Sequence, residues 1–474
     1  MQIMHNGPAD IQYFMKFIWP GIVYIVIVIG ELLALLSIAH VLRKSRMPAS
    51  TMSWLFVIIF VPLIGVPLYF IFGVRKSNSR IKLKSKMSLP GTSDSQVHPV
   101  NSLLVSLGIP SSSEGNIVKF HENGNAAYKE LVDLLTGAEK TIDIAIYILE
   151  DDPVGHEILS ILEDKAAHGI KIRLLLDGVG SFMLPKKYLK PLAKNGGQVA
   201  WFIPVFHRPL RGNTNLRNHR KIIIVDHNKI WTGGRNLAEE YLGPQSPSSC
   251  WIDISFCQQG PVVHTYQTIF EADWNFATKT VNNGAINYPQ PELNGKSCIQ
   301  VVPSGPDIAD DPIYAVLLTA CYGAKKSIFI VTPYYIPNMG IQEAIRLAVL
   351  RGVSVDLILP EKSNHRIADI ARNRYLRELA GAGANIWFVP DVMVHAKAFV
   401  IDNTFAMAGS ANLDIRSLFL NLEVVSCFYS KQDIEWLACW LESLRNQSIE
   451  HYPKPAGPLK EMFEGLILLF MYQL

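Results

Sequence analysis

Two pairs of residues with the same spacing could do chemistry on a phosphate. His219 and Lys221 are two positions apart, and His395 and Lys397 repeat the pattern. In an extended strand, side chains two positions apart point to the same face, so each pair can act together. An imidazole can attack phosphorus or transfer a proton, and an ammonium group can bind a negatively charged oxygen. The pairs therefore predict nucleophilic or acid–base chemistry on an anionic group.

An aspartate follows each histidine by seven positions, at Asp226 and Asp402. Seven is an odd number, so on an uninterrupted strand the aspartate faces away from its histidine. The spacing therefore leaves two interpretations open, a catalytic carboxylate or a structural role at the end of the strand.

A turn of small residues that ends in an amide follows each aspartate, in Gly233-Gly-Arg-Asn236 and Gly409-Ser-Ala-Asn412. Glycine lets the backbone come close to a ligand, and asparagine supplies an amide donor. Two histidines, two lysines and two asparagines could therefore surround one phosphate.

These residues belong to an internal duplication. Residues 138–144, 169–177 and 219–226 match residues 324–330, 352–360 and 395–402 in the same order. A repeat of roughly 170 residues is too long for a solenoid and indicates a duplicated domain. Buried strands predicted over 141–149 and 171–176, with a helix over 153–168 between them, favour an α/β fold with a largely parallel central sheet.

Two apolar runs, 17–42 and 54–73, precede the duplication. Each could cross a hydrocarbon core about 30 Å thick, so the sequence predicts a two-helix transmembrane hairpin in which Pro62 and Pro67 kink the second helix without ending it. The cations after the second run outnumber those between the runs, which places the rest of the chain in the cytoplasm. Glu31, inside the first run, could be functional or could bond the partner helix.

The composition agrees with a membrane protein. Of the 474 residues, 49% are hydrophobic and only 18% are charged, and the net charge is +3. Because a nuclease would favour a broad basic groove, nucleic acid is not an expected partner. The six cysteines form no close pair, so neither a structural zinc site nor a disulfide framework is predicted.

The duplicated motif, H-x-K-x4-D followed after six residues by G-[GS]-x-N, resembles the signature of the phospholipase D superfamily and occurs twice in full. Residues 216–221, 332–337 and 412–417, and the basic loop before Met47-Pro48, are similar to those of bacterial cardiolipin synthases. The resemblance runs from about residue 15 to the C-terminus.

The resemblance implies two tandem phospholipase D-like α/β sandwich domains that pack pseudo-symmetrically behind the hairpin. The implied divisions are a hairpin over 1–76, a linker over 77–115 with a short helix near 100–108, and domains over 116–290 and 291–474. The implied location is the bacterial inner membrane, with multiple passes and cytoplasmic catalytic domains.

The implied function is cardiolipin synthesis, in which two phosphatidylglycerol molecules give cardiolipin and glycerol without a metal or other cofactor. Phosphatidylglycerol, other anionic phospholipids and the membrane are the implied partners. One histidine forms a phosphohistidine while the other transfers protons. By analogy with the family, His219 is the nucleophile and His395 is the general acid and base. Catalytic roles are thus implied for His219, Lys221, Asp226, His395, Lys397 and Asp402.

The resemblance also implies roles around this set. Asn236 and Asn412 would bind phosphate oxygens, and Asp253 and Glu423 match the carboxylates that orient the histidines. The alternative function is a phospholipase D that hydrolyses phospholipids to phosphatidic acid; a nuclease and an inactive membrane scaffold fit the anchor and the two motifs less well.

For several other residues the sequence allows two roles. Arg217 and Arg220 could bind a second phosphate or form a solvated face, and Tyr334 and Tyr335 could line a lipid pocket or pack in the core. The C-terminal run 465–474 is too short to span a membrane and could enter the interface or cap the core. Three histidines outside the motifs are expected to be structural, namely His207, His264 and His365.

Overall fold

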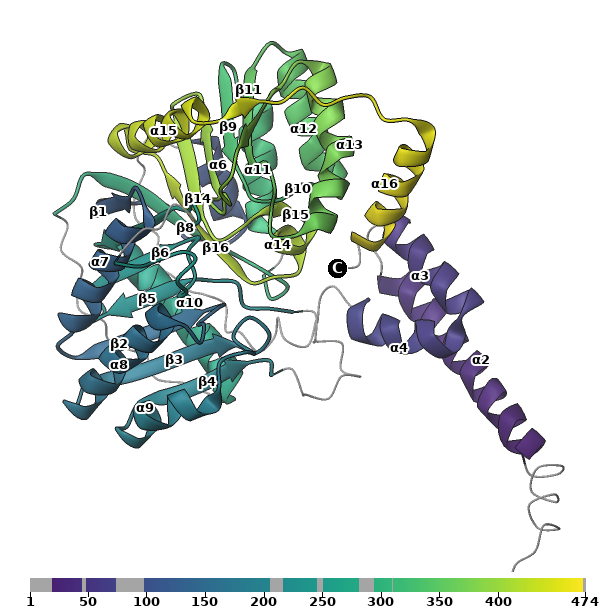
Figure 1. The fold of residues 1–474 in the computed structure, drawn as a ribbon, viewed down its shortest axis with the longest axis horizontal. Helices are drawn as coiled ribbons and strands as arrows, with labels where there is room; N and C mark the ends of the chain where they lie inside the picture. The colour runs from purple at the N-terminus through teal and green to yellow at the C-terminus, as the bar shows by residue number, and fades with distance from the viewer. Residues whose placement is uncertain are drawn as a thin grey trace, which may run out of the picture. The chain divides into compact units, whose positions relative to one another are not determined.

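The computed structural model divides into two compact units, one with the apolar N-terminal helices and one with both halves of the duplication (Figure 1). The structure describes residues 19–44, 48–73, 98–204, 216–244, 250–280, 294–308 and 310–471. The basic cluster at 75–86, most of the expected linker and His207 lie outside these residues.

Helix α2 (Trp19–Lys44) accounts for the first apolar run. Its 26 residues extend about 39 Å at 1.5 Å per residue. Within the described residues it is the one helix that is long and apolar enough to cross a membrane. The prediction of an apolar N-terminal helix is therefore confirmed, and Glu31 lies on the exposed surface of this helix.

The second apolar run forms two helices, α3 (Pro48–Phe60) and α4 (Pro62–Phe72), instead of one. Proline has no N–H to donate, and its ring disfavours a helical conformation in the residue before it. Val61 accordingly leaves the helical region, with φ −137° and ψ 62°. The expectation that Pro62 only kinks a continuous helix is therefore wrong, whereas Pro67 does lie inside α4.

Helix α4 lies close against α3. A Cβ atom at Gly65 would lie 2.5 Å from the carbonyl oxygen of Val57, so a glycine is needed at this approach. Ile58 and Tyr69 are buried in the apolar cluster of the three helices, and the Tyr69 hydroxyl lies 2.7 Å from Nδ1 of His40. With 13 and 11 residues, α3 and α4 are about 20 and 17 Å long, so each alone is shorter than a bilayer core.

The first half of the duplication alternates strands and helices. Its elements are β1 (Ser113–His121), α7 (Gly124–Thr136), β2 (Thr141–Ile146), α8 (Pro153–Ala167), β3 (Lys171–Asp177), a 3₁₀ turn (Lys186–Leu189), α9 (Lys190–Lys194), β4 (Gln198–Phe202), β5 (Ile222–Val225), β6 (Lys229–Gly233), β7 (Ser255–Gln259) and α10 (Val262–Thr278). The predicted strands and helix correspond to β2, β3 and α8. The Asp152 side chain caps α8 by accepting a hydrogen bond from the Gly155 N–H, which fixes where that helix begins.

The second half repeats this order with small additions. Its elements are β8 (Ser297–Ser304), α11 (Pro312–Gly323), β9 (Ser327–Val331), β10 (Tyr335–Ile336), α12 (Met339–Leu350), β11 (Ser354–Pro360), α13 (Arg366–Ala382), β12 (Asn385–Val389), β13 (Ala398–Ile401), β14 (Phe405–Gly409), β15 (Leu413–Asp414), α14 (Ile415–Phe419), β16 (Glu423–Phe428), α15 (Lys431–Asn446) and β17 (Ile449–Glu450). Helix α6 (Pro99–Ser106), within the expected linker, precedes the first half.

Among the described residues, the strands of both halves form one sheet of 15 strands (Figure 1). From one edge of the sheet, the strands of the first half follow in the order β4-β3-β2-β5-β6-β7-β1. The other edge strand is β17, and after it the strands of the second half follow in the order β12-β11-β9-β13-β14-β16-β8. In each series the first two pairings are parallel and the other four are antiparallel. The prediction of a largely parallel sheet is therefore wrong, because the short turns after β5 and β13 join antiparallel neighbours. β1 and β8 pair antiparallel at the centre. The two halves therefore share one topology, as the duplication predicts.

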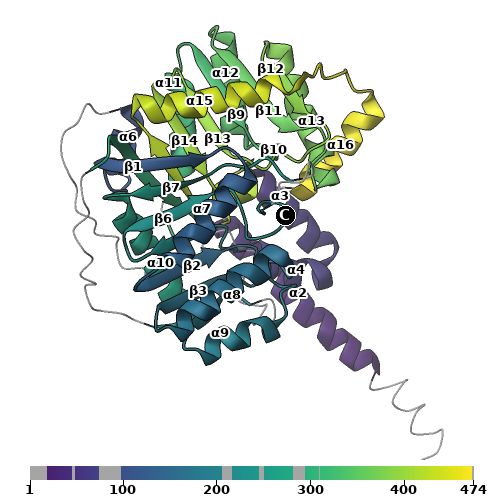
Figure 2. The ribbon, with the colours of Figure 1, turned by 60° about the vertical axis from the view of Figure 1, so that its left-hand side comes forward.

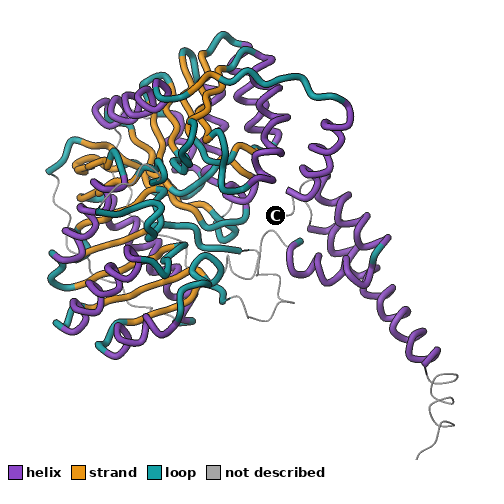
Figure 3. Tube along the Cα trace, in the orientation of Figure 1, coloured by secondary structure: helices purple, strands orange, loops and turns teal. Residues whose placement is uncertain are grey.

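Helices cover both faces of the sheet (Figures 2 and 3). Alternate residues of β5 divide between two apolar clusters, because successive side chains of a strand point to opposite faces. Ile223 and Val225 pack with α7, α8 and α9, whereas Ile222 and Ile224 pack with α10. The second cluster also contains Leu437 of α15, so it extends across both halves and joins them through apolar burial.

The C-terminal apolar run forms the end of helix α16 (Pro458–Met471) as far as the structure describes it. Glu464 is buried and forms an ion pair with Arg377 of α13, and Leu468 is buried. Met462 and Phe463 are exposed. One side of this helix therefore packs against the protein, while the other side is apolar and exposed.

Arg220 connects the two halves by polar contacts in the interior. Its side chain is buried, and its Nη1 donates to both carboxylate oxygens of Asp273 at 2.8 Å. Its Nε donates to the carbonyl oxygen of Glu423 at 3.0 Å and its Nη2 to that of Ser304 at 3.2 Å. Asp273 belongs to the first half and the two carbonyls belong to the second, so one guanidinium binds both halves. Arg220 therefore has a structural role, and the interpretation that it lies on a solvated face is wrong.

Replacing Arg220 by methionine should destabilise the fold strongly. The change leaves the Asp273 carboxylate buried without its cation, and loss of one partner of a buried ion pair costs about 3–5 kcal/mol. Urea unfolding of the detergent-solubilised protein measures the change. Arg346→Met on α12, which removes an exposed ion pair with Glu343, is the matched control and should shift unfolding little. Equal shifts for the two variants would contradict the role given to Arg220.

Candidate active site

The two motif histidines lie just before corresponding strands, His219 before β5 and His395 before β13. The residue before each histidine pairs with a residue of the other half. Asn218 forms a parallel bridge with Leu422, and Val394 forms one with Ile252. The backbone therefore brings residues from both halves to each histidine.

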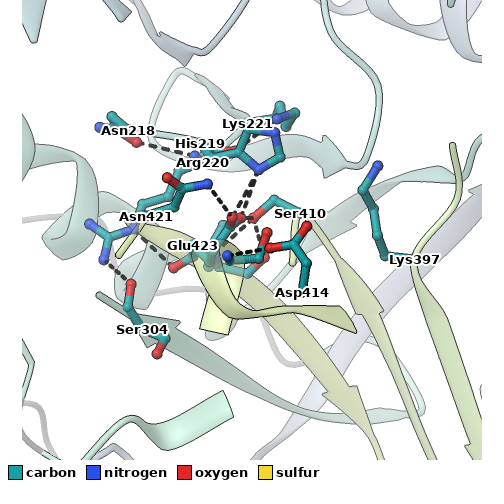
Figure 4. A network of polar contacts seen from close by, with 12 residues as sticks. Asn218, His219, Arg220, Lys221, Ser304, Lys397, Ser410, Asp414, Asn421 and Glu423 are labelled. Atoms are coloured by element: carbon teal, nitrogen blue, oxygen red, sulfur yellow. Dashed lines mark hydrogen bonds and ion pairs between the residues drawn. The ribbon is translucent and has the colours of Figure 1, made fainter. Parts of the chain in front are cut away.

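Each histidine is bound by the carboxylate of the other half. Nδ1 of His219 lies 3.0 Å from both carboxylate oxygens of Glu423, and Nδ1 of His395 lies 2.7 Å from Oδ2 of Asp253 (Figure 4 for the first pair). An Nδ1–H that donates to a carboxylate leaves Nε2 as the basic atom. The family resemblance implied that Asp253 and Glu423 orient the histidines, but no spacing indicated that the pairs cross between halves.

Both lysines of the motifs are buried beside their histidines. Nζ of Lys221 donates to the carbonyl oxygen of His219 at 2.8 Å, and Nζ of Lys397 lies 3.0 Å from Nε2 of His395. Burial lowers the pKa of Lys221 to about 7 and that of Lys397 to about 8. A bound anion would favour the charged form of both, since an opposite charge raises the pKa of an ammonium group.

The surroundings of the site keep the histidines neutral and the carboxylates negatively charged. Burial lowers the pKa of His395 to about 3, with the Lys397 ammonium adding to the effect. Burial also lowers the pKa of His219, although Glu423 opposes this. Burial alone would raise the pKa of Asp253, but Lys397 and His395 outweigh it and lower the value to about 2. At neutral pH the site therefore contains neutral imidazoles oriented by charged carboxylates.

The small-residue turns fit against these carboxylates. A Cβ atom at Gly234 would lie 2.2 Å from Oδ1 of Asp253, so glycine leaves the space that the carboxylate occupies. The corresponding Ser410 instead donates its hydroxyl to Glu423. Asn236 and Asn412 are buried, and in the described part of the chain Oδ1 of each has no hydrogen-bond partner. Buried amide oxygens normally accept a hydrogen bond, so a hydroxyl group of a bound molecule would complete them.

The contacts of Asp226 and Asp402 favour a role at the strand ends over the predicted catalytic role. Asp226 follows β5 with a positive φ of 51°, and its carboxylate accepts the backbone N–H groups of residues 139–141 at 2.7–2.9 Å. Asp402 follows β13 with φ 53° and binds residues 325–327 in the same way. Each carboxylate thus fixes the start of the neighbouring strand, which is the strand-end role that the odd spacing left open.

Two tyrosines that the sequence did not indicate contact the histidine rings edge-on. The ring centroids of Tyr147 and His219 are 4.9 Å apart, and those of Tyr241 and His395 are 5.0 Å apart. Neither tyrosine has a fixed spacing from a motif histidine that would have revealed it. Tyr335 is fully buried and its hydroxyl donates to Gln342, so it belongs to the core rather than a lipid pocket.

The remaining candidate residues lie on elements outside the motifs. Tyr334 is half-buried and contacts the His365 ring at 5.3 Å between centroids, and His264 lies on α10. Within the described residues no group of three His, Cys, Asp or Glu side chains could hold a metal ion. The charge of each lysine also acts on the histidine of the other motif, Lys397 on His219 and Lys221 on His395, so the two His–Lys pairs share one site. With their two carboxylates they can bind an anion, attack it and transfer protons.

Comparison with protein families identifies two regions. Residues 131–274 and 317–445 match the model described as "Cardiolipin synthase, PLD-like domain". Residues 32–73 match "Phospholipase_D-nuclease N-terminal".

Relatives and solved structures agree with this match. The chain is 31% identical over 462 residues to "Cardiolipin synthase 1" of Bacillus anthracis, covering 88% of this chain and 90% of the relative. It is 31% identical over 438 residues to "Cardiolipin synthase" of Listeria monocytogenes serotype 4a, covering 87% and 91%. The crystal structure of phosphatidylserine synthase from Haemophilus influenzae Rd KW20 aligns with a TM-score of 0.57 at 14% identity, over 75% of this chain and 95% of that one. This last likeness concerns the fold.

Asp226→Ala should reduce stability without removing the chemistry of the site. Three backbone N–H groups lose their acceptor, which should lower the free energy of unfolding by about 1–3 kcal/mol. Burial raises the pKa of Asp226, but its backbone hydrogen bonds outweigh this and lower it. The stabilisation is therefore present above the unfolded pKa of about 4 and is lost as the pH falls through the lower folded value.

Urea unfolding at several pH values measures this contribution. Turnover per folded molecule should stay within a few-fold of that of the unmodified chain. A loss of turnover by orders of magnitude in a well-folded Asp226→Ala protein would restore the catalytic interpretation.

Proposed function

This chain belongs to the cardiolipin synthase family of phospholipase D-like proteins and is a phospholipid-transferring enzyme, and we propose that it converts two phosphatidylglycerol molecules into cardiolipin and glycerol. The observation that carries the proposal is the pair of crossed His–carboxylate contacts, with one lysine beside each histidine. This arrangement supports a single phosphate bound between the two halves.

In the first step, Nε2 of one histidine attacks the phosphorus of phosphatidylglycerol. As the anionic phosphate binds, the other histidine takes up a proton at Nε2, because a nearby opposite charge favours the imidazolium. An N–P bond then forms and the P–O bond to the glycerol headgroup breaks, while that histidine gives this proton to the departing glycerol oxygen. The phosphatidyl group is then held as a phosphohistidine.

In the second step, a hydroxyl of another phosphatidylglycerol attacks the phosphohistidine. The second histidine takes the hydroxyl proton, a P–O bond forms and the P–N bond breaks. Cardiolipin is released and the enzyme returns to its starting state. Lys221, Lys397, Asn236 and Asn412 would bind the non-bridging oxygens, whose negative charge grows in each transition state.

His219 and His395 are buried, 7% and 5% exposed. Transfer requires that the bound lipids keep water away from the phosphohistidine. Hydrolysis to phosphatidic acid, the alternative function, needs water at the same place. The outcome depends on whether a lipid hydroxyl occupies the site before water does.

The proposal is tested with purified enzyme and phosphatidylglycerol labelled in its acyl chains. Cardiolipin with an equal amount of free glycerol is expected, and His219→Ala and His395→Ala should each lower the rate on the order of 10³-fold or more. His264→Ala, on α10, is the control and should stay within a few-fold. Phosphatidic acid as sole product would support the hydrolase, and unchanged rates in both motif variants would contradict the mechanism.

We also propose that the N-terminal unit is inserted in the bacterial inner membrane as two apolar passes, with the catalytic halves in the cytoplasm. Helix α2 would form the first pass, and α3 with α4 would form the second. The basic residues after the second run would stay inside. The division between the two catalytic domains would fall near residues 290 and 291, between α10 and β8.

Labelling with a membrane-impermeant maleimide in cells tests this topology. Cys439 is exposed on the catalytic unit and should react only after the cells are opened. A cysteine placed at Ser45, between the apolar runs, should react in intact cells if the chain crosses twice. Labelling of Ser45→Cys only in opened cells would instead mean that α3 and α4 turn back within one side of the membrane.

A further inference from the structure

A short apolar loop follows β3 in the first half of the duplication. Its side chains Val179, Phe182 and Met183 are 43%, 53% and 73% exposed. Among the described residues from β1 to α10, these three and Ile117 are the exposed large hydrophobic side chains. Single exposed apolar residues are ordinary, whereas a cluster marks a surface that binds an apolar partner. Residues 178–184 are called the apolar loop below.

The carboxylate of Asp177 joins the apolar loop to the first motif. Its Oδ1 accepts the backbone N–H of Val179 at 2.8 Å, and its Oδ2 accepts that of Asn218 at 2.9 Å, next to His219. Nη1 of Arg217 lies 3.5 Å from Oδ1, and the Arg217 side chain is buried, so it does not form a solvated face. One carboxylate therefore fixes the start of the loop beside the first histidine.

Ser181 attaches the apolar loop to the segment that follows β2. Its hydroxyl donates to the carbonyl oxygen of Tyr147 at 3.0 Å and accepts the N–H of Leu149 at 3.0 Å. The ring of Tyr147 contacts the His219 ring edge-on. Leu184, the last residue of the loop, is buried. The exposed side chains therefore lie on a backbone that is anchored beside the active site.

The chain that leaves the apolar loop is basic. Lys186, Lys187 and Lys190 are exposed on the 3₁₀ turn and at the start of α9. Residues 178–194 include no aspartate or glutamate. Apolar side chains beside lysines are typical of segments that lie in the interface of an anionic bilayer.

The duplication provides an internal comparison for the apolar loop. The offset of 183 residues that relates β3 to β11 places residues 361–367 at the corresponding position. Their sequence is Glu-Lys-Ser-Asn-His-Arg-Ile, so six of the seven are polar or charged, and Ile367 already belongs to α13. The fold therefore accepts a polar loop at this position and does not itself require the apolar residues.

A lipid bilayer is the partner that these features fit. The chain belongs to a family of phospholipid-transferring enzymes, and α2 is long and apolar enough to cross a membrane. A bilayer offers acyl chains to Val179 and Met183 and anionic headgroups to the lysines that follow them.

We propose that the apolar loop inserts into the bilayer surface and brings the active site to the lipid. A phospholipid then moves from the bilayer toward His219 beside a loop that is itself in contact with the acyl chains. The inference goes beyond the proposed function, because it holds for any reaction of a membrane phospholipid at this site, transfer or hydrolysis.

Fluorescence quenching tests the insertion directly. The full chain, with Cys439→Ser to remove an exposed thiol, receives Met183→Cys and a fluorophore on the new cysteine. It is placed in vesicles of phosphatidylcholine and phosphatidylglycerol in which the phosphatidylcholine has a nitroxide on an acyl chain. A nitroxide quenches only at short range, so several-fold stronger quenching is expected than with Lys194→Cys, the matched control.

The control probe lies at the opposite end of the parallel strands. Lys194 is the last residue of α9, which leads to the start of β4, and β4 runs parallel to β3. Equal quenching of the two probes would overturn the inference.

The rate of glycerol release tests the consequence for catalysis. The double variant Val179→Ser, Met183→Ser should lower turnover of long-chain phosphatidylglycerol in vesicles about ten-fold, because two apolar side chains no longer enter the lipid. Turnover of a short-chain phosphatidylglycerol dissolved as monomers should stay within two-fold, since this substrate does not have to leave a bilayer. Leu350→Ser, which replaces an exposed leucine at the end of α12, is the control and should leave both rates unchanged.

Equal losses on the two substrates, or no loss on either, would overturn the inference. Glycerol is released in both transfer and hydrolysis, so this readout is independent of the proposed product. Phosphatidic acid in place of cardiolipin would overturn the proposed function and leave the comparison of the two rates intact.

Discussion

The structure depends on one constraint, which is that each imidazole must be oriented by a carboxylate of the opposite half. A buried neutral histidine needs an acceptor for Nδ1–H if Nε2 is to face a substrate, and a buried carboxylate needs that donor and a nearby cation. The parallel bridges before β5 and β13, the central pairing of β1 with β8 and the contacts of Arg220 all hold the two halves in the register that these pairs require.

Much of the fold could be predicted because its signals are local or repeated. The apolar strands β2 and β3, helix α8 and the duplication follow from periodicity and from matching segments. The break at Pro62 was less predictable, since proline kinks some apolar helices and ends others, and the surrounding packing decides. The role of Gly65, which permits α4 to approach α3, could not be predicted, because it depends on how the two helices pack.

The site, too, could be predicted only in part. The types and spacing of His219, Lys221 and their counterparts indicated phosphate chemistry, and odd spacing raised doubt about Asp226 and Asp402. The crossed partners and the edge-on tyrosines could not be predicted, because they depend on distant segments that the sheet brings together. The sequence shows Arg220 only as a charged residue beside a motif. Its burial and its role in connecting the two halves become visible only in the structure.

The crossed carboxylates have an evolutionary consequence. A chain with only one half would contain a histidine without its orienting acid and an acid without its histidine. Two such chains related by a twofold axis through the β1–β8 pairing would restore both contacts at once. A single half could therefore complete its site only as a homodimer, whereas in the duplicated chain each copy can diverge. The two copies differ in this way where Met393 stands in place of Arg217 and where Glu240 stands in place of Arg416.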